Sequence, residues 1–263
     1  MFEYPQIDPV LISLGPLKIH WYGMMYLLGF LGAWLLGSWR AKSRVVWSRD
    51  DVSDMVLYGA IGAVFGGRIG YILFYKFDWY LHNPMDVLRV WEGGMSFHGG
   101  LLGVLVAIWL FARKTDRRFF QVTDFAAPLV PVGLFFGRIG NFINQELWGR
   151  VTDGSWGVVF PLAGPEPRHA SQLYEAALEG LVLFTVLWIY SSKPRELGRV
   201  SGMFLVLYSI FRFVAEFARQ PDAHLGFIAL EWMTMGQLLS VPMLLAGLGI
   251  MYWSGRQRLP TAL

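Results

Sequence analysis

Cysteine is absent from this 263-residue chain. Its absence excludes disulfides, thiolate metal sites and a cysteine nucleophile supplied by the protein itself. Charge is also scarce, because Asp, Glu, Lys and Arg make up 16% of the residues whereas hydrophobic residues make up 55%. Soluble domains typically contain about 25% charged residues. Together with a mean hydropathy of +0.43, these proportions predict an integral membrane protein that crosses the bilayer several times.

Apolar stretches long enough to cross a bilayer, about 20 residues each, recur along the chain. We expect an all-α fold with one transmembrane domain over residues 1–263 and small loops between the helices. The seven predicted spans are 19–38, 52–74, 96–112, 120–138, 171–190, 201–218 and 236–254. Glycine is abundant, and Gly62, Gly66 and Gly70 form a row at spacings of four that is typical of closely packed membrane helices.

Lysine and arginine are distributed unevenly among the predicted loops, and loops rich in them stay in the cytoplasm. Thirteen of the 22 basic residues follow the first, third, fifth and seventh spans: Arg40, Lys42, Arg44, Arg49, Arg113, Lys114, Arg117, Arg118, Lys193, Arg195, Arg199, Arg256 and Arg258. This alternation predicts an N-terminus outside and a C-terminus in the cytoplasm. The amino end lacks the basic segment and the cleavage site of a signal peptide, so we expect the first span to be retained.

Polar residues gather at the predicted outer ends of the spans. The tetrapeptide GRIG occurs twice, and its arginines, Arg68 and Arg138, end spans that run outward. Arg212 lies in another outward-running span, while His98 and Tyr22 open spans at the same side. One arginine at the bilayer centre costs roughly 2.5 to 3.5 kcal/mol. Three arginines at similar depth therefore indicate a polar cavity toward the outer leaflet.

Simpler explanations exist for single arginines. Arg68 lies near a helix end, from which its side chain could snorkel to the interface. Arg212 and Glu216 are four residues apart, a spacing typical of a structural ion pair on one helix.

The segment GRIGNFINQELWGR, residues 137–150, carries the strongest chemical signal. If its helix continues, Arg138, Asn141 and Gln145 share one face. A guanidinium group binds phosphate through two parallel hydrogen bonds and stays charged when it is desolvated. The segment therefore predicts an anionic, phosphate-bearing ligand, which in the outer leaflet would be a phospholipid head group.

Six ordered motifs relate the chain to a known family. They are HWYG, GGRIGY, MSFHGGLLG, GRIGNFINQELWG, RHASQLYE and FRFVAEFARQPD. In these motifs the chain resembles the bacterial prolipoprotein diacylglyceryl transferases. The resemblance implies transfer of the diacylglyceryl group of phosphatidylglycerol to the lipobox cysteine thiol of a prolipoprotein signal peptide, which forms a thioether and releases glycerol phosphate. The missing cysteine agrees with this, since the sulfur comes from the substrate.

The resemblance also implies the setting of the reaction. We expect a multi-pass protein of the bacterial inner membrane, with its active site toward the outer leaflet. Its partners would be phosphatidylglycerol, prolipoprotein signal peptides and membrane lipids, without nucleic acid, metal or cofactor.

The positions that match the key arginines of the family are Arg138 and Arg212, which would stabilise charge on the departing phosphate. His98 is the candidate base, because an unperturbed histidine can accept a thiol proton near neutral pH. His98 could instead bind a carbonyl or a lipid ester. The expected substrate-binding residues are Tyr22, Arg68, Asn141, Asn144, Glu146, Gly149, Tyr208 and Glu216.

Three roles in this region stay open. Glu146 could orient Arg138 or accept the proton. Gly149 is expected to permit a turn, and Glu175 and Glu179 are read as helix-packing partners.

Two other classes of function remain. A noncatalytic membrane scaffold would tolerate Arg138→Ala with little functional loss. The other class is a transporter or channel for an anionic, phosphate-bearing solute. Such a protein should carry polar groups at the midplane or at both membrane sides, whereas those of this chain lie toward one side.

The Gly- and Pro-rich segment 152–167 is expected to form an ordered loop or a short strand pair.

Overall fold

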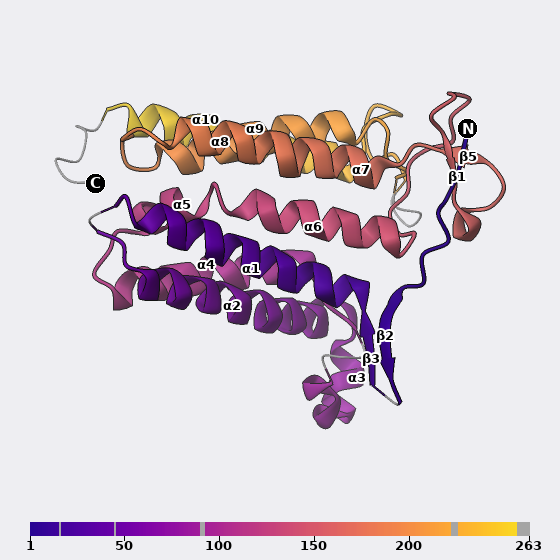
Figure 1. The fold of residues 1–263 in the computed structure, drawn as a ribbon, viewed down its shortest axis with the longest axis horizontal. Coiled ribbons are helices and arrows are strands. Elements are labelled where there is room, and N and C mark those ends of the chain that lie inside the picture. The colour runs from indigo at the N-terminus through magenta and orange to yellow at the C-terminus, as the bar shows by residue number, and fades with distance from the viewer. Residues whose placement is uncertain (16, 45, 90–92, 222–225, 257–263) are drawn as a thin grey trace. The chain divides into compact units, whose positions relative to one another are not determined.

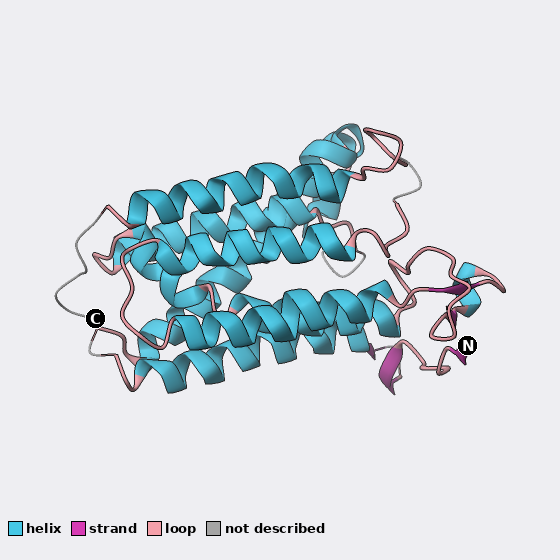
Figure 2. Cartoon of the chain, turned by 90° about the horizontal axis from the view of Figure 1, so that it is seen from above, coloured by secondary structure: helices cyan, strands magenta, loops and turns pink. Residues whose placement is uncertain are grey.

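The structure is a computed structural model that describes residues 1–15, 17–44, 46–89, 93–221 and 226–256. The chain divides into two compact units, each described by itself below. The larger unit comprises Met1–Leu35 and Asp124–Leu263, and the smaller unit comprises Leu36–Thr123. Helices make up most of the described chain, and the strands are short (Figure 2).

The larger unit contains most of the elements (Figure 1). Its strands are β1 (Phe2–Glu3), β2 (Val10–Leu14), β3 (Leu17–His20), β4 (Val158–Val159) and β5 (Pro167–Arg168). Its helices are α6 (Val130–Ile143), η3 (Pro161–Ala163), α7 (Ser171–Glu175), η4 (Ala176–Val182), α8 (Leu183–Tyr190), α9 (Arg199–Ala215) and α10 (Met235–Ser254). Helix α1 (Trp21–Ala41) begins in this unit.

The smaller unit is built on two long helices. It contains α2 (Arg49–Tyr75), α3 (Phe77–His82), η1 (Pro84–Leu88) and α4 (Phe97–Lys114), and α5 (Phe119–Ala126) begins in it. Ser48 caps α2 in a capping box with Asp51, which satisfies backbone donors that a helix start leaves unpaired.

Each of the seven predicted spans coincides with a helix or with consecutive helices. Within the described residues, four helices are long and apolar enough to cross a membrane, and a bent pair makes up to five. The protein is therefore a polytopic membrane protein. The count of seven stays a prediction, because it also needs α1 and the 17-residue α9. Arg258, which contributed to the predicted orientation, lies outside the described residues.

The fourth predicted span is broken. Helices α5 and α6 meet at an angle of 49°. The break contains Pro128, whose ring cannot donate a backbone hydrogen bond, and Pro131 stands at the start of α6. Both prolines are fully buried, so neighbouring side chains enclose the break.

The expectation of an all-α chain is incomplete, because the larger unit contains two small sheets. One is the antiparallel hairpin of β2 and β3. In the other, β4 pairs antiparallel with β5, which confirms the predicted strand pair, and parallel with β1. The Tyr4 side chain is buried under this second sheet, and its hydroxyl donates to the carbonyl of Ile143 over 2.9 Å. The amino end of the chain thus packs against the end of α6.

Glycine sets the distance between α2 and α4. A Cβ atom added at Gly62 would lie 2.5 Å from the carbonyl oxygen of Gly103, and one at Gly70 would lie 2.7 Å from the Cα of Gly99. Gly66 also faces Gly103. The predicted role of the glycine row is confirmed, because only glycine lets the two backbones approach this closely.

We expect Gly66→Ala to separate these helices and to lower the free energy of unfolding by about 1 to 3 kcal/mol, the usual cost of overpacking. The matched control is Gly59→Ala on the same helix, where an added Cβ meets nothing within 4 Å. That variant should be neutral or stabilising, since alanine favours helix. Thermal unfolding in detergent compares the two, and equal stabilities would contradict the packing argument.

Candidate functional site

Helix α7 and the π-helical turn η4 carry two carboxylates into the larger unit. In the sequence SQLYEAALEG, Glu175 and Glu179 are four residues apart and so share one face. π-helical turns are rare and are often found at functional sites. Both carboxylates are fully buried, with side-chain exposures of 1% and 0%. Carboxylates are almost never buried this deeply unless they are paired.

Their partners are the two arginines predicted to be catalytic. Oε2 of Glu175 lies 2.7 Å from Nη2 of Arg138 and 2.8 Å from Nη1 of Arg212. Nη2 of Arg138 also lies 3.2 Å from Oε2 of Glu179. Two guanidinium groups from different helices, α6 and α9, therefore meet on one carboxylate oxygen.

Glu216 completes this group. Its Oε2 lies 2.9 Å from Nη2 of Arg212, which confirms the ion pair predicted from their spacing. Its Oε1 accepts a hydrogen bond from Thr234 over 3.0 Å and so ties α9 to the start of α10. The five side chains of Arg138, Glu175, Glu179, Arg212 and Glu216 are called the charge cluster below. Tyr208 lies near enough to interact electrostatically with both of its arginines.

One edge of the Arg138 guanidinium group can still bind a ligand. Its ion pairs use Nη2, and no described residue accepts a hydrogen bond from its Nε or Nη1. The side chain is 16% exposed, and neither Nε nor Nη1 is among the buried unpaired atoms of the described residues, so both donors are accessible. A guanidinium group anchored at one nitrogen and open at the others can bind a further anion.

A second polar group forms where α6 ends. The side-chain amides of Asn141 and Asn144 each donate to the exposed carboxylate of Glu146 over 3.3 Å. Tyr22 interacts with Asn141 and lies against the backbone of Gly140. The side chains of Tyr22, Asn141, Asn144 and Glu146 are called the amide cluster below.

The prediction that Arg138, Asn141 and Gln145 share one helix face is wrong for Gln145. Helix α6 stops at Ile143, and the chain turns so that the side chain of Gln145 accepts a hydrogen bond from the backbone of Leu162 over 3.2 Å.

The prediction of a turn at Gly149 is also wrong. Gly149 lies in extended backbone that bridges to Arg219. A Cβ at this position would lie 2.5 Å from the carbonyl oxygen of His169 and 2.6 Å from that of Ala218. Glycine is required here because backbone crosses on both sides.

Arg68 and His98 belong to the smaller unit. Arg68 is 5% exposed and donates to the backbone carbonyls of Asp86, Val87, Gly93 and Gly94. It thereby clamps the segment after α3 onto α2. His98 is exposed, and its ring packs edge-on against Phe97 at a centroid distance of 5.6 Å.

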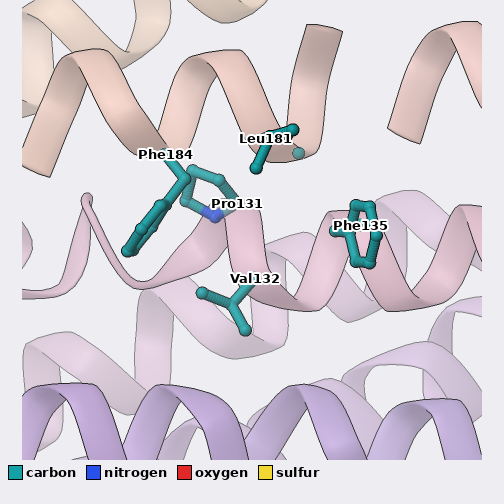
Figure 3. Close-up of a pocket in the computed structure, with 6 residues that line it drawn as sticks. Pro131, Val132, Phe135, Leu181 and Phe184 are labelled. Atoms are coloured by element: carbon teal, nitrogen blue, oxygen red, sulfur yellow. The ribbon is translucent and has the colours of Figure 1, made fainter. Parts of the chain in front are cut away.

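An apolar groove of about 140 Å³ lies between α6 and the η4–α8 segment. In Figure 3, Leu181 and Phe184 lie beside Pro131 of α6, Val132 lies below them, and Phe135 lies further along that helix. Phe135 is one helical turn before Arg138, so the groove adjoins the charge cluster along the same helix. The described residues that line it carry no polar side chain, so the groove suits hydrocarbon.

Comparison with known proteins identifies the family. Residues 9–253 match the family described as prolipoprotein diacylglyceryl transferase. The chain belongs to this family. Proteins named phosphatidylglycerol–prolipoprotein diacylglyceryl transferase include one from Chromohalobacter salexigens that is 61% identical over 98% of this chain and 96% of its own. One from Legionella pneumophila strain Philadelphia 1 is 58% identical over 97% and 100%, and one from Pseudomonas aeruginosa strain PAO1 is 57% identical over 98% and 97%.

For this transferase, we expect Glu175→Gln to lower the free energy of unfolding by about 3 kcal/mol or more, because the change leaves buried arginines without their shared carboxylate. The matched control is Glu166→Gln, whose exposed carboxylate lies 3.9 Å from Arg168. An exposed pair of this kind contributes at most about 1 kcal/mol. Chemical unfolding in detergent measures both variants, and a Glu175→Gln protein as stable as the control would contradict the proposed ion pairing.

Proposed function

We propose that this chain transfers the diacylglyceryl group of phosphatidylglycerol to the lipobox cysteine of prolipoproteins at a site formed by the charge cluster and the amide cluster. The activity follows from membership of the transferase family. The alternative of an anion transporter finds no support among the relatives, which are named as transferases. The observation that carries the site assignment is the meeting of Arg138 and Arg212 on Glu175.

The chemistry requires stabilisation of a leaving phosphate. The cysteine sulfur attacks the glyceryl carbon, a carbon–sulfur bond forms, and the carbon–oxygen bond to the phosphate breaks. Negative charge then accumulates on the released glycerol phosphate. In the proposal, the open donors of Arg138 bind this phosphate, and Arg212 adds positive charge beside it. Fixed donors in a water-poor site are effective because they need no reorganisation during the reaction.

The amide cluster supplies binding for the rest of the head group. Phosphatidylglycerol ends in a glycerol whose hydroxyls both donate and accept hydrogen bonds. The Glu146 carboxylate can accept hydrogen bonds from these hydroxyls. The amides of Asn141 and Asn144 and the hydroxyl of Tyr22 can donate hydrogen bonds to them. Both clusters include residues of α6 or of the turn that follows it, so one ligand can reach both.

The apolar groove offers a place for an acyl chain of the same lipid. It continues along α6 away from Arg138 and has an apolar lining. A head group at the charge cluster and a chain in the groove would place the lipid along α6. Because the chain comes from bilayer hydrocarbon and not from water, the groove would position it by close packing and not by the hydrophobic effect.

His98 remains the proposed acceptor of the thiol proton. A free cysteine has a pKa near 8.5 and an unperturbed histidine one near 6.5, so histidine can accept this proton near neutral pH. Arg68 keeps a place in the proposal as a positioning residue rather than a phosphate ligand, since backbone carbonyls occupy its guanidinium group.

The site is proposed to face the outer leaflet of the bacterial inner membrane. Support comes from the uneven distribution of basic residues and from the pairing of β1 with β4. That pairing puts the amino end beside the loop that follows the fourth predicted span, as a common outer side requires.

We expect Arg138→Ala and Arg212→Ala each to lower kcat/KM at least about 100-fold, because each removes preorganised charge from the leaving phosphate. The assay uses purified protein in liposomes of phosphatidylglycerol with a lipobox peptide, and it measures the thioether-lipidated peptide and the released glycerol phosphate. Lys193→Ala, an exposed residue in the loop before α9, is the control and should behave like the wild type.

Two outcomes of this assay would contradict the proposal. Near-normal turnover by either arginine variant would remove the assignment of the phosphate site. Movement of an anionic solute across the liposome membrane without lipidation of the peptide would instead favour a transporter.

A separate prediction concerns His98. If it accepts the proton, His98→Gln should lower turnover most strongly near neutral pH and should remove the part of the pH–rate profile that reports the histidine. Turnover of the lipobox peptide measured from about pH 5.5 to 9 tests this, and an unchanged profile would reduce His98 to a binding residue.

A further inference from the structure

The turn that carries Glu146 is strained. Gln145 has a φ of +53° and Leu147 a φ of +57°, so residues on both sides of Glu146 adopt the left-handed conformation. Side chains with a Cβ disfavour this conformation, and glycine is usual there. Strained residues of this kind persist only where the surrounding structure holds them, and they cluster at functional sites.

Two polar side chains at the start of α7 hold this turn. The side-chain amide of Gln172 donates to the carbonyl of Glu146 over 2.7 Å. The hydroxyl of Ser171 donates to the carbonyl of Leu147 over 2.9 Å. A backbone hydrogen bond of 2.8 Å from Glu146 to Asn141 closes the turn from the other side.

Burial of the Gln172 side chain at this position costs free energy. Ser171 is 0% exposed and Gln172 is 1% exposed. The amide oxygen of Gln172 is buried without a hydrogen-bond partner among the described residues. An apolar side chain would avoid this unsatisfied group, so the fold gives no reason for glutamine apart from its bond to the turn.

The same helical segment also holds the arginines. Glu175 follows Gln172 by three residues and joins Arg138 to Arg212. The segment that begins with Ser171 therefore contacts both clusters, through neutral side chains at its first turn and through carboxylates at the next.

We propose that Ser171 and Gln172 are positioning residues that hold the strained turn and so aim the Glu146 carboxylate at the phosphatidylglycerol head group. The inference rests on the proposed function of the amide cluster. Neither side chain touches the substrate; each acts through the backbone carbonyl that it binds. Without them, the left-handed residues relax and Glu146 moves away from Asn141 and Asn144.

The main test is Gln172→Met, which keeps the size of the side chain and removes the donor. It should raise the KM for phosphatidylglycerol about tenfold, because a displaced Glu146 loses about one hydrogen bond to the head group. The kcat should stay within about twofold of the wild type, as for lost uniform binding. Ser171→Ala is a smaller change that should shift KM in the same direction. It carries the test if Gln172→Met does not fold.

A second substitution that restores KM distinguishes a positioning role from a general loss of structure. In the Gln172→Met background, Leu147→Gly removes the cost of the left-handed conformation, so KM should return toward the wild-type value. The matched control is Leu230→Gly, at a leucine with a φ of +53° in a different loop, and it should not restore KM. The same pair of second changes is tested on Ser171→Ala.

The outcomes are distinguishable. A wild-type KM in both Gln172→Met and Ser171→Ala would overturn this inference, and so would equal rescue by Leu147→Gly and Leu230→Gly. Rescue by neither would also overturn it, because strain would not be the cause. If Arg138→Ala is inactive in the same assay, the proposed function stands even when this inference fails, whereas wild-type protein without lipidation activity would refute the function itself.

Discussion

The packing of α6, α7 and α9 in the larger unit depends on one carboxylate, that of Glu175. Its Oε2 atom lies within 2.8 Å of guanidinium nitrogens from both α6 and α9. Two arginines placed side by side would repel each other in a medium of low dielectric, where charges interact strongly. The shared carboxylate offsets this repulsion and fixes both side chains. Three helical segments are thereby tied together at the point where the substrate phosphate is proposed to bind.

Small residues make this arrangement sterically possible. A Cβ added at Gly180 would lie 2.6 Å from the Cβ of Phe135, so glycine lets η4 approach α6 closely. That approach brings Glu179, the preceding residue, to Arg138. Gly236 plays a similar part at the start of α10, where an added Cβ would lie 2.8 Å from a carboxylate oxygen of Glu216. Close backbone contact and charge pairing thus occur at the same places.

The sequence predicted the helices and part of the site well, for identifiable physical reasons. Long apolar runs are local signals, and each predicted span coincides with helix. The pair of Arg212 and Glu216 was also predictable, because both residues lie on one helix at a fixed spacing. Gly62, Gly66 and Gly70 were recognised because their spacing is regular.

Contacts between distant segments were not predictable in this way. The two GRIG segments are identical, yet Arg68 binds backbone carbonyls whereas Arg138 binds buried carboxylates. The helix-packing role predicted for Glu175 and Glu179 leaves out the ion pairs, although two carboxylates in an apolar span signal that cations must face them. Strands of two residues, such as β1 and β4, are too short to show a pattern. The end of α6 depends on buried side chains of α7 that no local rule connects to it.

The central claim is that the charge cluster binds the phosphate of a lipid. Solid-state NMR tests it most directly, through the dipolar coupling between phosphorus of bound phosphatidylglycerol and arginine side-chain ¹⁵N in vesicles. The account predicts a coupling in the wild type that persists in Arg168→Gln and disappears when Arg138 and Arg212 are both changed to glutamine. A coupling that survives in that double variant, in a protein that still folds, would contradict it.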